Sequence, residues 1–281
     1  MCNNLANATG QVRYTFLNDY MFKKILQDNT DILKSLLQSL LRLESDDIKS
    51  IEVRNPIKPG TSIISKEFIL DLLIEIYDLG VINLEMQVIN YRDWPERSLQ
   101  YLCRTFDRLQ KGKDYSGSKP AIQISFLNFN LFEDHKEFYA TYMLRNTKDS
   151  HIYTDKFILK YISMPNIALA TKEDIDYDLV RWVRIFKAKT WEELKMLAEE
   201  NEFMTKAVNT LYAANGDLAE TLEAQAREDY ILHEQKQKAY IKKIETEMAS
   251  MQAAITGKDA EIAGKDAEIA RLKQLLADSN L

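Results

Sequence analysis

The stretch that decides the fold is Ile69–Asn90, which reads ILDLLIEIYDLGVINLEMQVIN. It holds two apolar runs on either side of Asp78-Leu79-Gly80. A three-residue hairpin loop favours a type I turn followed by a glycine with positive φ, and this triplet fits that preference. The stretch therefore predicts two neighbouring antiparallel strands joined by a tight turn.

This hairpin brings acidic side chains together. With Asp78–Gly80 as the loop, Asp71 lies opposite Gln87, and Leu73 lies opposite Glu85 two residues further along. Alternation of side chains puts Asp71, Glu85 and Gln87 on one face of the sheet. Opposed Cβ atoms lie about 4.5–5.5 Å apart and diagonal ones roughly 7–8 Å apart. We therefore expect these three side chains to converge on one point.

Strands this apolar are expected to be central, where polar groups are costly without partners. Two close carboxylates repel each other unless a proton or a cation lies between them. Mg²⁺ prefers oxygen ligands and retains waters that act as nucleophiles. The pattern favours Mg²⁺ at Asp71 and Glu85, with Mn²⁺ as a substitute. The alternative is a carboxylate pair on an exposed sheet face, salt-bridged to Lys or Arg.

The remaining periodicity predicts an α/β protein with a mixed central sheet flanked by helices. Helices are expected to begin at Asn18 or Asp19, at Asn29 or Thr30, at about Pro95, and again from Ile175 onward. The Pro95 helix should run to about Gln110 and stop at Gly112. Strands are expected at Ile48–Ile57, Glu67–Asp78, Val81–Asn90, Ala121–Phe129, Phe138–Arg145 and Phe157–Met164.

The C-terminal stretch carries a heptad pattern. Apolar residues recur at every seventh position, at Ile241, Met248, Ile255, Ile262, Ile269 and Leu276. Ile244, Met251 and Leu272 fill the companion position three residues later, whereas Lys258 and Lys265 interrupt it. This pattern predicts a left-handed coiled coil that joins copies of the chain, weakened at the two lysines. The alternative is a single solvated helix.

Composition limits the classes of function. Net charge is −6 and the pI about 5.3, so any DNA contact requires a local basic surface rather than a basic protein. The two cysteines are too few for a disulfide framework or a thiolate zinc site. We expect a cytoplasmic protein with no membrane contact, because neither a signal peptide nor a stretch of about 18–20 apolar residues is visible.

A basic stripe is predicted on the helix that starts near Pro95. Its members fall at i, i+4, i+7 and i+11 and so share one helical face: Arg97, Tyr101, Arg104 and Arg108. Lys111 and Lys113 extend it past the helix. Such a stripe suits phosphate, with Tyr101 able to stack or hydrogen-bond. The alternative is a solvated face that pairs with Asp107 and Glu96.

The spacing of the two acids resembles the D…ExK signature of PD-(D/E)XK nucleases. Asp71 is followed by thirteen residues and then by Glu85-Met86-Gln87. Over about residues 14–230 the chain is similar to the PD-(D/E)XK family transposases and recombination-promoting nucleases of bacteria. The shared features are Asn18-Asp19…Phe22-Lys23, Ile69-Leu70-Asp71, Asn83-Leu84-Glu85-Met86-Gln87, Arg97…Tyr101, Lys111-Gly112-Lys113-Asp114-Tyr115 and Ile122–Phe129.

The resemblance implies a restriction-endonuclease-like core, which we expect over residues 1–170, followed by a helical region over 171–230. The heptads predict the coiled coil over 231–281. The resemblance also implies Asp71 and Glu85 as metal ligands, joined by the main-chain carbonyl of Met86. Gln87 stands where most members have lysine, and its amide is expected to position the attacking water. Asp19 is either an accessory acid or a helix N-cap.

The resemblance further implies a Mg²⁺-dependent DNA endonuclease linked to recombination or mobile elements. In the late strand Leu159-Lys160 replace an expected Glu-Leu pair, and no role is assigned to them. Three alternatives stay open from the residues alone. They are an inactive relative that binds DNA or other partners, a scaffold that oligomerises through its coiled coil, and a metal-dependent hydrolase of RNA or nucleotides.

Overall fold

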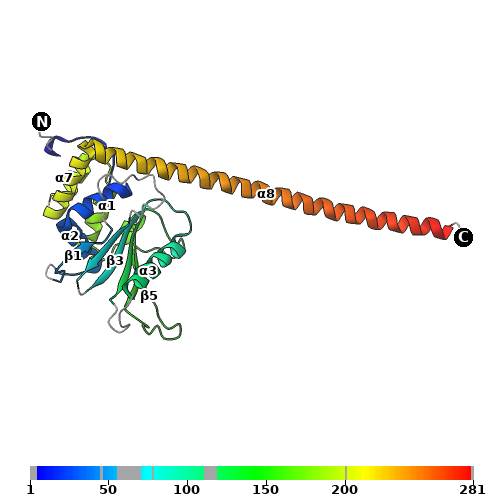
Figure 1. Ribbon diagram of the computed structural model, residues 1–281, viewed down its shortest axis with the longest axis horizontal. Helices are drawn as coiled ribbons and strands as arrows, with labels where there is room; N and C mark the ends of the chain where they lie inside the picture. The colour runs from blue at the N-terminus through cyan, green and yellow to red at the C-terminus, as the bar shows by residue number, and fades with distance from the viewer. Residues whose placement is uncertain are drawn as a thin grey trace. The chain divides into compact units, whose positions relative to one another are not determined.

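The computed structural model describes residues 5–44, 47–55, 71–77, 79–110, 119–199 and 201–279. Two compact units divide the chain, one formed by Met1–Glu228 and the other by Asp229–Leu281. The first unit contains a six-stranded sheet with helices on both faces, and Figure 1 shows α1 and α2 on one side of it and α3 on the other. The predicted α/β architecture is confirmed.

The sheet is mixed, as expected. Its strands lie in the order β1-β2-β3-β4-β6-β5. The central neighbours β3, β4 and β6 run parallel, whereas β1, β2 and β5 each pair antiparallel with their neighbours. The bounds are β1 (Ile51–Val53), β2 (Leu72–Ile76), β3 (Gly80–Gln87), β4 (Ala121–Leu127), β5 (Tyr139–Met143) and β6 (Phe157–Ser163).

The predicted register of the hairpin is wrong by two residues. Leu73 pairs with Asn83 rather than with Glu85, and Ile76 pairs with Gly80. Gly80 is the first residue of β3 and not the last residue of the loop, with φ at +132°. A Cβ on Gly80 would lie 2.3 Å from the carbonyl oxygen of Pro120, so only glycine fits this close approach. A slip of two residues keeps every side chain on its predicted face.

Several boundaries differ from the expected ones. Within the described residues 48–55, the strand expected at Ile48–Ile57 is limited to β1, and the one expected at Val81–Asn90 ends at Gln87. The N-terminal part of the run expected at Glu67–Asp78 lies outside the described residues, as do Lys111, Gly112 and Lys113.

Helices pack on the apolar face of the sheet. Even-numbered residues of β2, β3 and β4, such as Ile74, Leu84 and Ile124, are buried against helices in one core. The helices in this core include α1 (Asp19–Asp28), α2 (Thr30–Leu41), α5 (Leu179–Lys187), α6 (Trp191–Ala198) and α7 (Glu202–Gly216). Shorter elements complete the layer: η1 (Leu5–Asn7), η3 (Met164–Leu169) and α4 (Lys172–Asp176).

The opposite face carries α3 (Trp94–Gln110), which packs against β3, β4 and β6. Pro95 lies in its first turn, as predicted. A smaller apolar cluster around Trp94, Leu127 and Tyr161 lies at this face. Several odd-numbered side chains of β3 and β4 on this face are buried and polar: Asn83, Glu85, Gln87, Gln123 and Ser125. This face therefore holds the candidate site.

The last helix, α8, spans Leu218–Ser279. Its first residues belong to the first unit, where Ala224 is fully buried in the core. The predicted helix over the heptads is confirmed, and in this single chain its seam residues are exposed, among them Ile241, Ile255 and Ile269. Among the described helices, none combines the length and the apolar character needed to cross a membrane.

Candidate active site

Asp71, Glu85 and Gln87 lie on the polar face of β2 and β3, buried to 8%, 7% and 8% exposure. Leu72 pairs with Leu84, so continuing the register by one residue puts Asp71 directly opposite Glu85. The two-residue shift therefore replaces a diagonal approach of the carboxylates by a direct one. Their burial rules out an exposed, solvent-screened carboxylate pair.

A row of buried amides and a hydroxyl continues from these acids across the sheet. Asn83 Nδ2 donates to Gln123 Oε1 at 2.8 Å, and Gln123 Nε2 donates to Ser125 Oγ at 3.2 Å. Asn83 also hydrogen-bonds the carboxylate of Asp71. Satisfied buried polar groups of this kind hold one another rigidly. The row fixes Asp71 from the side of β4.

Burial governs the protonation of both acids. It raises the pKa of Glu85 to about 8, against the opposing charge of Arg97, while the charges of Asp71 and Asp19 raise it further. Burial also raises the pKa of Asp71, and the hydrogen bond from Asn83 and the charge of Lys23 oppose that rise. Both carboxylates thus favour bound positive charge, a proton or a cation, in this environment.

Arg97 reaches the site from α3. Its Nη2 donates to Glu85 Oε1 at 2.9 Å, and its Nε donates to the phenolic oxygen of Tyr101 at 2.9 Å. The guanidinium also lies over the rings of Trp94 and Tyr101. The i, i+4 spacing on one helix face makes these contacts possible. Arg97 and Tyr101 thus lie on one face of α3, as predicted, and Arg97 contacts Glu85 from there.

Asp19 lies at the same site but is not the N-cap of α1. That position belongs to Asn18, whose side chain accepts from Met21 N at 3.2 Å. Asp19 instead makes a bidentate contact with Arg227 of α8, at 2.8 Å to Nε and 2.7 Å to Nη2. The charges of both residues reach Glu85. The N-cap explanation of Asp19 is therefore wrong.

Lys23 lies one turn after Asp19 on α1 and is only 2% exposed. Its charge interacts with that of Asp71. Burial lowers the pKa of Lys23 to about 8, and Asp71 opposes this fall. One side of α1 thus lies along both carboxylates, with an acid toward Glu85 and an amine toward Asp71.

Gln87 is held by the main chain beyond its own strand. Its Nε2 donates to the carbonyl oxygen of Ile89 at 2.8 Å. This bond orients the side-chain amide. The side chain of Met86 is buried in the core on the opposite face, so only its main chain lies in line with the acids.

The donor set fits a divalent cation at the two carboxylates. Asp71 Oδ1 and Glu85 Oε2 are buried, and within the described part of the chain neither has a hydrogen-bond partner. Unpartnered buried oxygens are costly, and a hard cation such as Mg²⁺ satisfies them. Among the described residues, His, Cys, Asp and Glu form no metal-binding group of three or more. Further ligands would have to be main-chain oxygens or waters.

A family model for the PD-(D/E)XK nuclease family transposases matches residues 16–241. The chain belongs to this family. The matched region includes every site residue named above, from Asp19 to Arg227. No curated protein and no solved structure shows a significant match to the chain.

The structure of this PD-(D/E)XK family member describes only some of the other residues that were predicted to bind DNA. Arg104 is exposed on α3, on the helix face that Arg97 and Tyr101 share. The side chain of Arg108, together with Lys111 and Lys113, lies outside the described residues. Their role stays a prediction.

Sequence reasoning missed part of the family member's site. Gln123 and Ser125 alternate with apolar residues in β4, a period-two signal that marked a polar face beside Glu85. Lys23 appeared in the resemblance without a role. Arg227 carried no signal, because 208 residues separate it from Asp19.

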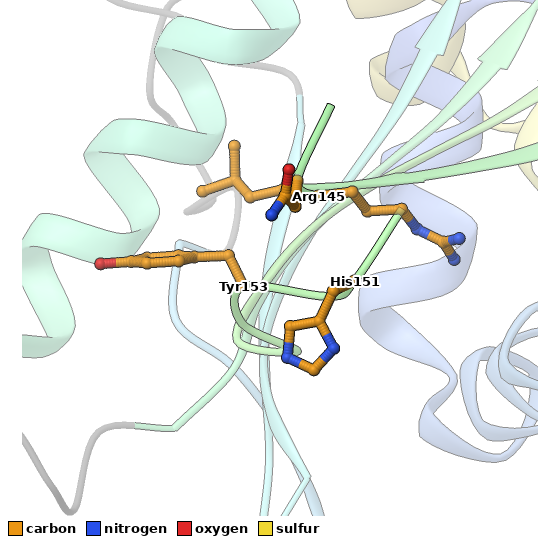
Figure 2. A pocket seen from close by; sticks show the side chains of 5 residues that line it. Arg145, His151 and Tyr153 are labelled. Carbon is orange, nitrogen blue, oxygen red and sulfur yellow. The ribbon is translucent and has the colours of Figure 1, made fainter. Parts of the chain in front are cut away.

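A surface pocket lies away from these carboxylates. It lies on the hairpin that precedes β6 and is lined by Leu144, Arg145, Asn146, His151 and Tyr153. In Figure 2 the side chains of Arg145 and Tyr153 point away from each other. β6 runs parallel to β3, so this hairpin lies at the opposite end of the strands from Glu85. It presents no convergent set of reactive groups.

Proposed function

We propose that this chain is a metal-dependent DNA endonuclease that hydrolyses phosphodiester bonds, in the setting of recombination or mobile elements. The observation that carries the proposal is the pair of buried, directly opposed carboxylates, each with an unpartnered oxygen, inside the region matched by a nuclease family. The biological setting comes from the family alone.

In the proposed site Asp71, Glu85 and the main-chain carbonyl of Met86 hold Mg²⁺, for which Mn²⁺ substitutes. When bound, such a cation lowers the pKa of a coordinated water and offsets charge on the phosphate. The carbonyl oxygen of Gln87 accepts a hydrogen bond from the attacking water and orients it. The water oxygen bonds to phosphorus and gives up a proton to solvent, the P–O bond to the leaving sugar oxygen breaks, and that oxygen takes up a proton from solvent.

Arg97 and Tyr101 would bind the DNA backbone beside the cleaved bond. Both lie on α3 next to Glu85, and Arg97 is about one-third exposed. A planar guanidinium binds phosphate through two hydrogen bonds, and a phenol stacks or donates one. Arg104, Lys111 and Lys113 are proposed to extend this surface. A local basic surface of this kind would bind phosphate despite the net charge of −6.

The test is cleavage of supercoiled plasmid DNA with Mg²⁺ or Mn²⁺ by the wild type, Asp71→Asn and Glu85→Gln. Glu75→Gln is the matched control, since Glu75 lies on the same face of β2 but pairs with Arg54 at 2.6 Å. We expect the wild type and Glu75→Gln to nick or linearise the plasmid and the two site variants to lose at least 100-fold in rate. Intact plasmid with the wild type across a concentration series of both metals contradicts the proposal.

The same assay separates the competing functions. A protein that binds duplex DNA without cutting it, with or without metal, is an inactive relative acting as a binding module. Cleavage of single-stranded RNA in preference to DNA identifies a ribonuclease. The DNA-binding and RNA-cleavage measurements are made on the same protein preparation, so their results can be compared directly with those for DNA cleavage.

Self-association through the tail is part of the proposal. The heptad residues form an exposed apolar seam along α8, among them Met248, Ile262 and Leu272, and a seam with this period fits a second copy of the same helix. Light scattering on the full chain and on a chain ending at Tyr230 tests this. An unchanged number of subunits after truncation contradicts the coiled coil as the oligomerisation element.

A further inference from the structure

The centre of the proposed reaction needs positive charge, because a phosphate gains negative charge as water attacks it. Gln87, the residue that follows the metal-binding acids along β3, is a neutral amide. One of its N–H groups is already bound to the carbonyl of Ile89 at 2.8 Å. It can orient a water, but it brings no charge to the phosphate.

In the part of the chain that the structure describes, three cations lie around the acids, one from each of three helices. Arg97 of α3 is bound to Glu85 at 2.9 Å, and Arg227 of α8 is bound to Asp19 at 2.7 Å. Both guanidiniums are thus held by carboxylates at the edges of the site. The third cation is Lys23 of α1, whose charge interacts with Asp71.

Lys23 differs from the arginines in depth. It is 2% exposed, as deeply buried as the acids themselves, whereas the side chain of Arg97 is 32% exposed. Charge in a site from which water is excluded acts more strongly on a reacting group than charge at a wet rim. A buried lysine is also costly, so its presence beside an unpartnered Asp71 oxygen calls for a function.

The orientation of Lys23 is fixed by the core. Its neighbour Phe22 packs edge-on against Phe126 and Phe186 on the apolar side of the sheet. Asp19, one turn earlier, is clamped by Arg227. These contacts fix the rotation of α1 about its axis, so that Lys23 is turned away from solvent and its charge lies close enough to interact with that of Asp71.

We propose that Lys23 is a catalytic residue whose ammonium contacts the phosphate undergoing cleavage, and so provides the positive charge that Gln87 does not. This inference rests on the proposed nuclease function. Lys23 takes part as a charge and hydrogen-bond donor only, so no covalent step is involved. A structural counter-ion for Asp71 is the competing role, and the two roles predict different results.

The experiment measures single-turnover cleavage by four forms of the full chain: wild type, Lys23→Met, Gln87→Lys and the double variant Lys23→Met/Gln87→Lys. We expect Lys23→Met to lose about 100-fold or more in rate, the size seen when one charge-stabilising donor is removed. We expect the double variant to recover at least tenfold relative to Lys23→Met, since Gln87 lies on the same face at the same site. Lys24→Met is the control, because Lys24 neighbours Lys23 but pairs with Asp28 and Glu220.

Two readouts do not depend on cleavage. Lys23→Met should bind duplex DNA in EDTA as tightly as the wild type, because a 2% exposed side chain contributes nothing to the outer surface. Lys23→Met should also bind Mn²⁺ at least as tightly as the wild type, because it removes a positive charge near Asp71 that repels the metal ion. If Lys23→Met fails to fold by thermal unfolding, Lys23→Gln replaces it in every arm.

A folded Lys23 variant that cleaves within threefold of the wild type overturns the proposal. So does a folded, slow variant that Gln87→Lys does not rescue, since that result fits a counter-ion for Asp71. Failure of the wild type itself to cleave contradicts the nuclease function instead, and is seen before any variant is compared.

Discussion

Arg97 Nη2 lies 2.9 Å from Oε1 of Glu85, so a protein cation already touches one of the two carboxylates that would hold the metal. A divalent cation at Glu85 and the guanidinium of Arg97 therefore compete for the same charge. Once a metal is bound, Arg97 needs a new anionic partner, and the phosphate of a DNA strand is one. In the proposed mechanism, metal binding and DNA binding would thereby be coupled at Arg97.

The first prediction concerns this competition. Arg97→Ala should bind Mn²⁺ at least as tightly as the wild type but bind DNA about tenfold or more weakly, since a charged hydrogen bond to phosphate is lost. Calorimetry with Mn²⁺ and fluorescence anisotropy with a labelled duplex measure the two effects. Arg104→Ala, on the same helix face but away from Glu85, should leave Mn²⁺ affinity unchanged. Weaker Mn²⁺ binding by Arg97→Ala would contradict the competition.

The second prediction concerns metal-linked stability. A ligand present at 100 times its dissociation constant stabilises the folded state by about 2.7 kcal/mol. Saturating Mn²⁺ should therefore raise the melting temperature of the wild type by about 5 °C or more. Asp71→Asn should show no such rise, because it removes the negative charge of one of the two carboxylates that would hold the metal. Differential scanning fluorimetry with and without EDTA provides the measurement, and an equal rise in both proteins would place the metal elsewhere.

The third prediction follows from the protonation of Glu85. Its pKa is about 8 in the folded protein and 4.5 in an unperturbed chain. Between these values the folded state holds a proton that the unfolded state has lost, so the metal-free protein becomes less stable as pH rises through this window. The urea concentration at the midpoint of unfolding, measured in EDTA, should decrease as the pH is raised from 5 to 8. Glu85→Gln should flatten this profile, and an identical slope in the variant would assign the effect to other groups.

The fourth prediction concerns the clamp between Asp19 and Arg227. Their side chains are 13% and 18% exposed, so removing either partner should cost about 1–3 kcal/mol. A double-mutant cycle with Asp19→Asn and Arg227→Met, followed by urea unfolding, isolates the pair. The exposed pair of Asp31 and Lys206 is the control and should couple by less than about 1 kcal/mol. Equal coupling energies in the two cycles would show that the Asp19–Arg227 pair stabilises the fold no more than an exposed ion pair does.

The fifth prediction concerns the heptads. Lys258 and Lys265 occupy positions where an apolar residue is preferred. Lys258→Leu/Lys265→Leu should raise the melting temperature of the tail and make it depend more steeply on protein concentration. Circular dichroism at several concentrations tests this on the full chain. A tail whose melting is independent of concentration in both proteins would be a single helix.

Local periodicity predicted most of the fold. The apolar alternation of β3 and β4, the turn at Gly80 and the proline at the start of α3 each specify an element by themselves. The register of the first hairpin was wrong, because Gly80 is held in β3 by its close approach to Pro120, forty residues later. A contact of that kind has no local signal.

The site shows the same division. Asp71 and Glu85 are predictable since both lie in one hairpin, and alternation fixes their faces. The residues that complete the site come from other elements, and only packing brings them together. Lys23 is buried because of how α1 packs on the sheet. Arg227 reaches the site because its part of α8 contacts Asp19 of α1.

The clamp of Asp19 and Arg227 also orders events during synthesis. The two residues are 208 positions apart, so the ribosome must produce and release residue 227 before the bond can form. Until then the acids near Glu85 lack one of their three cations. A newly made chain therefore carries an incomplete candidate site until residue 227 has left the ribosome, and a DNA-cutting activity built this way would appear only after that point.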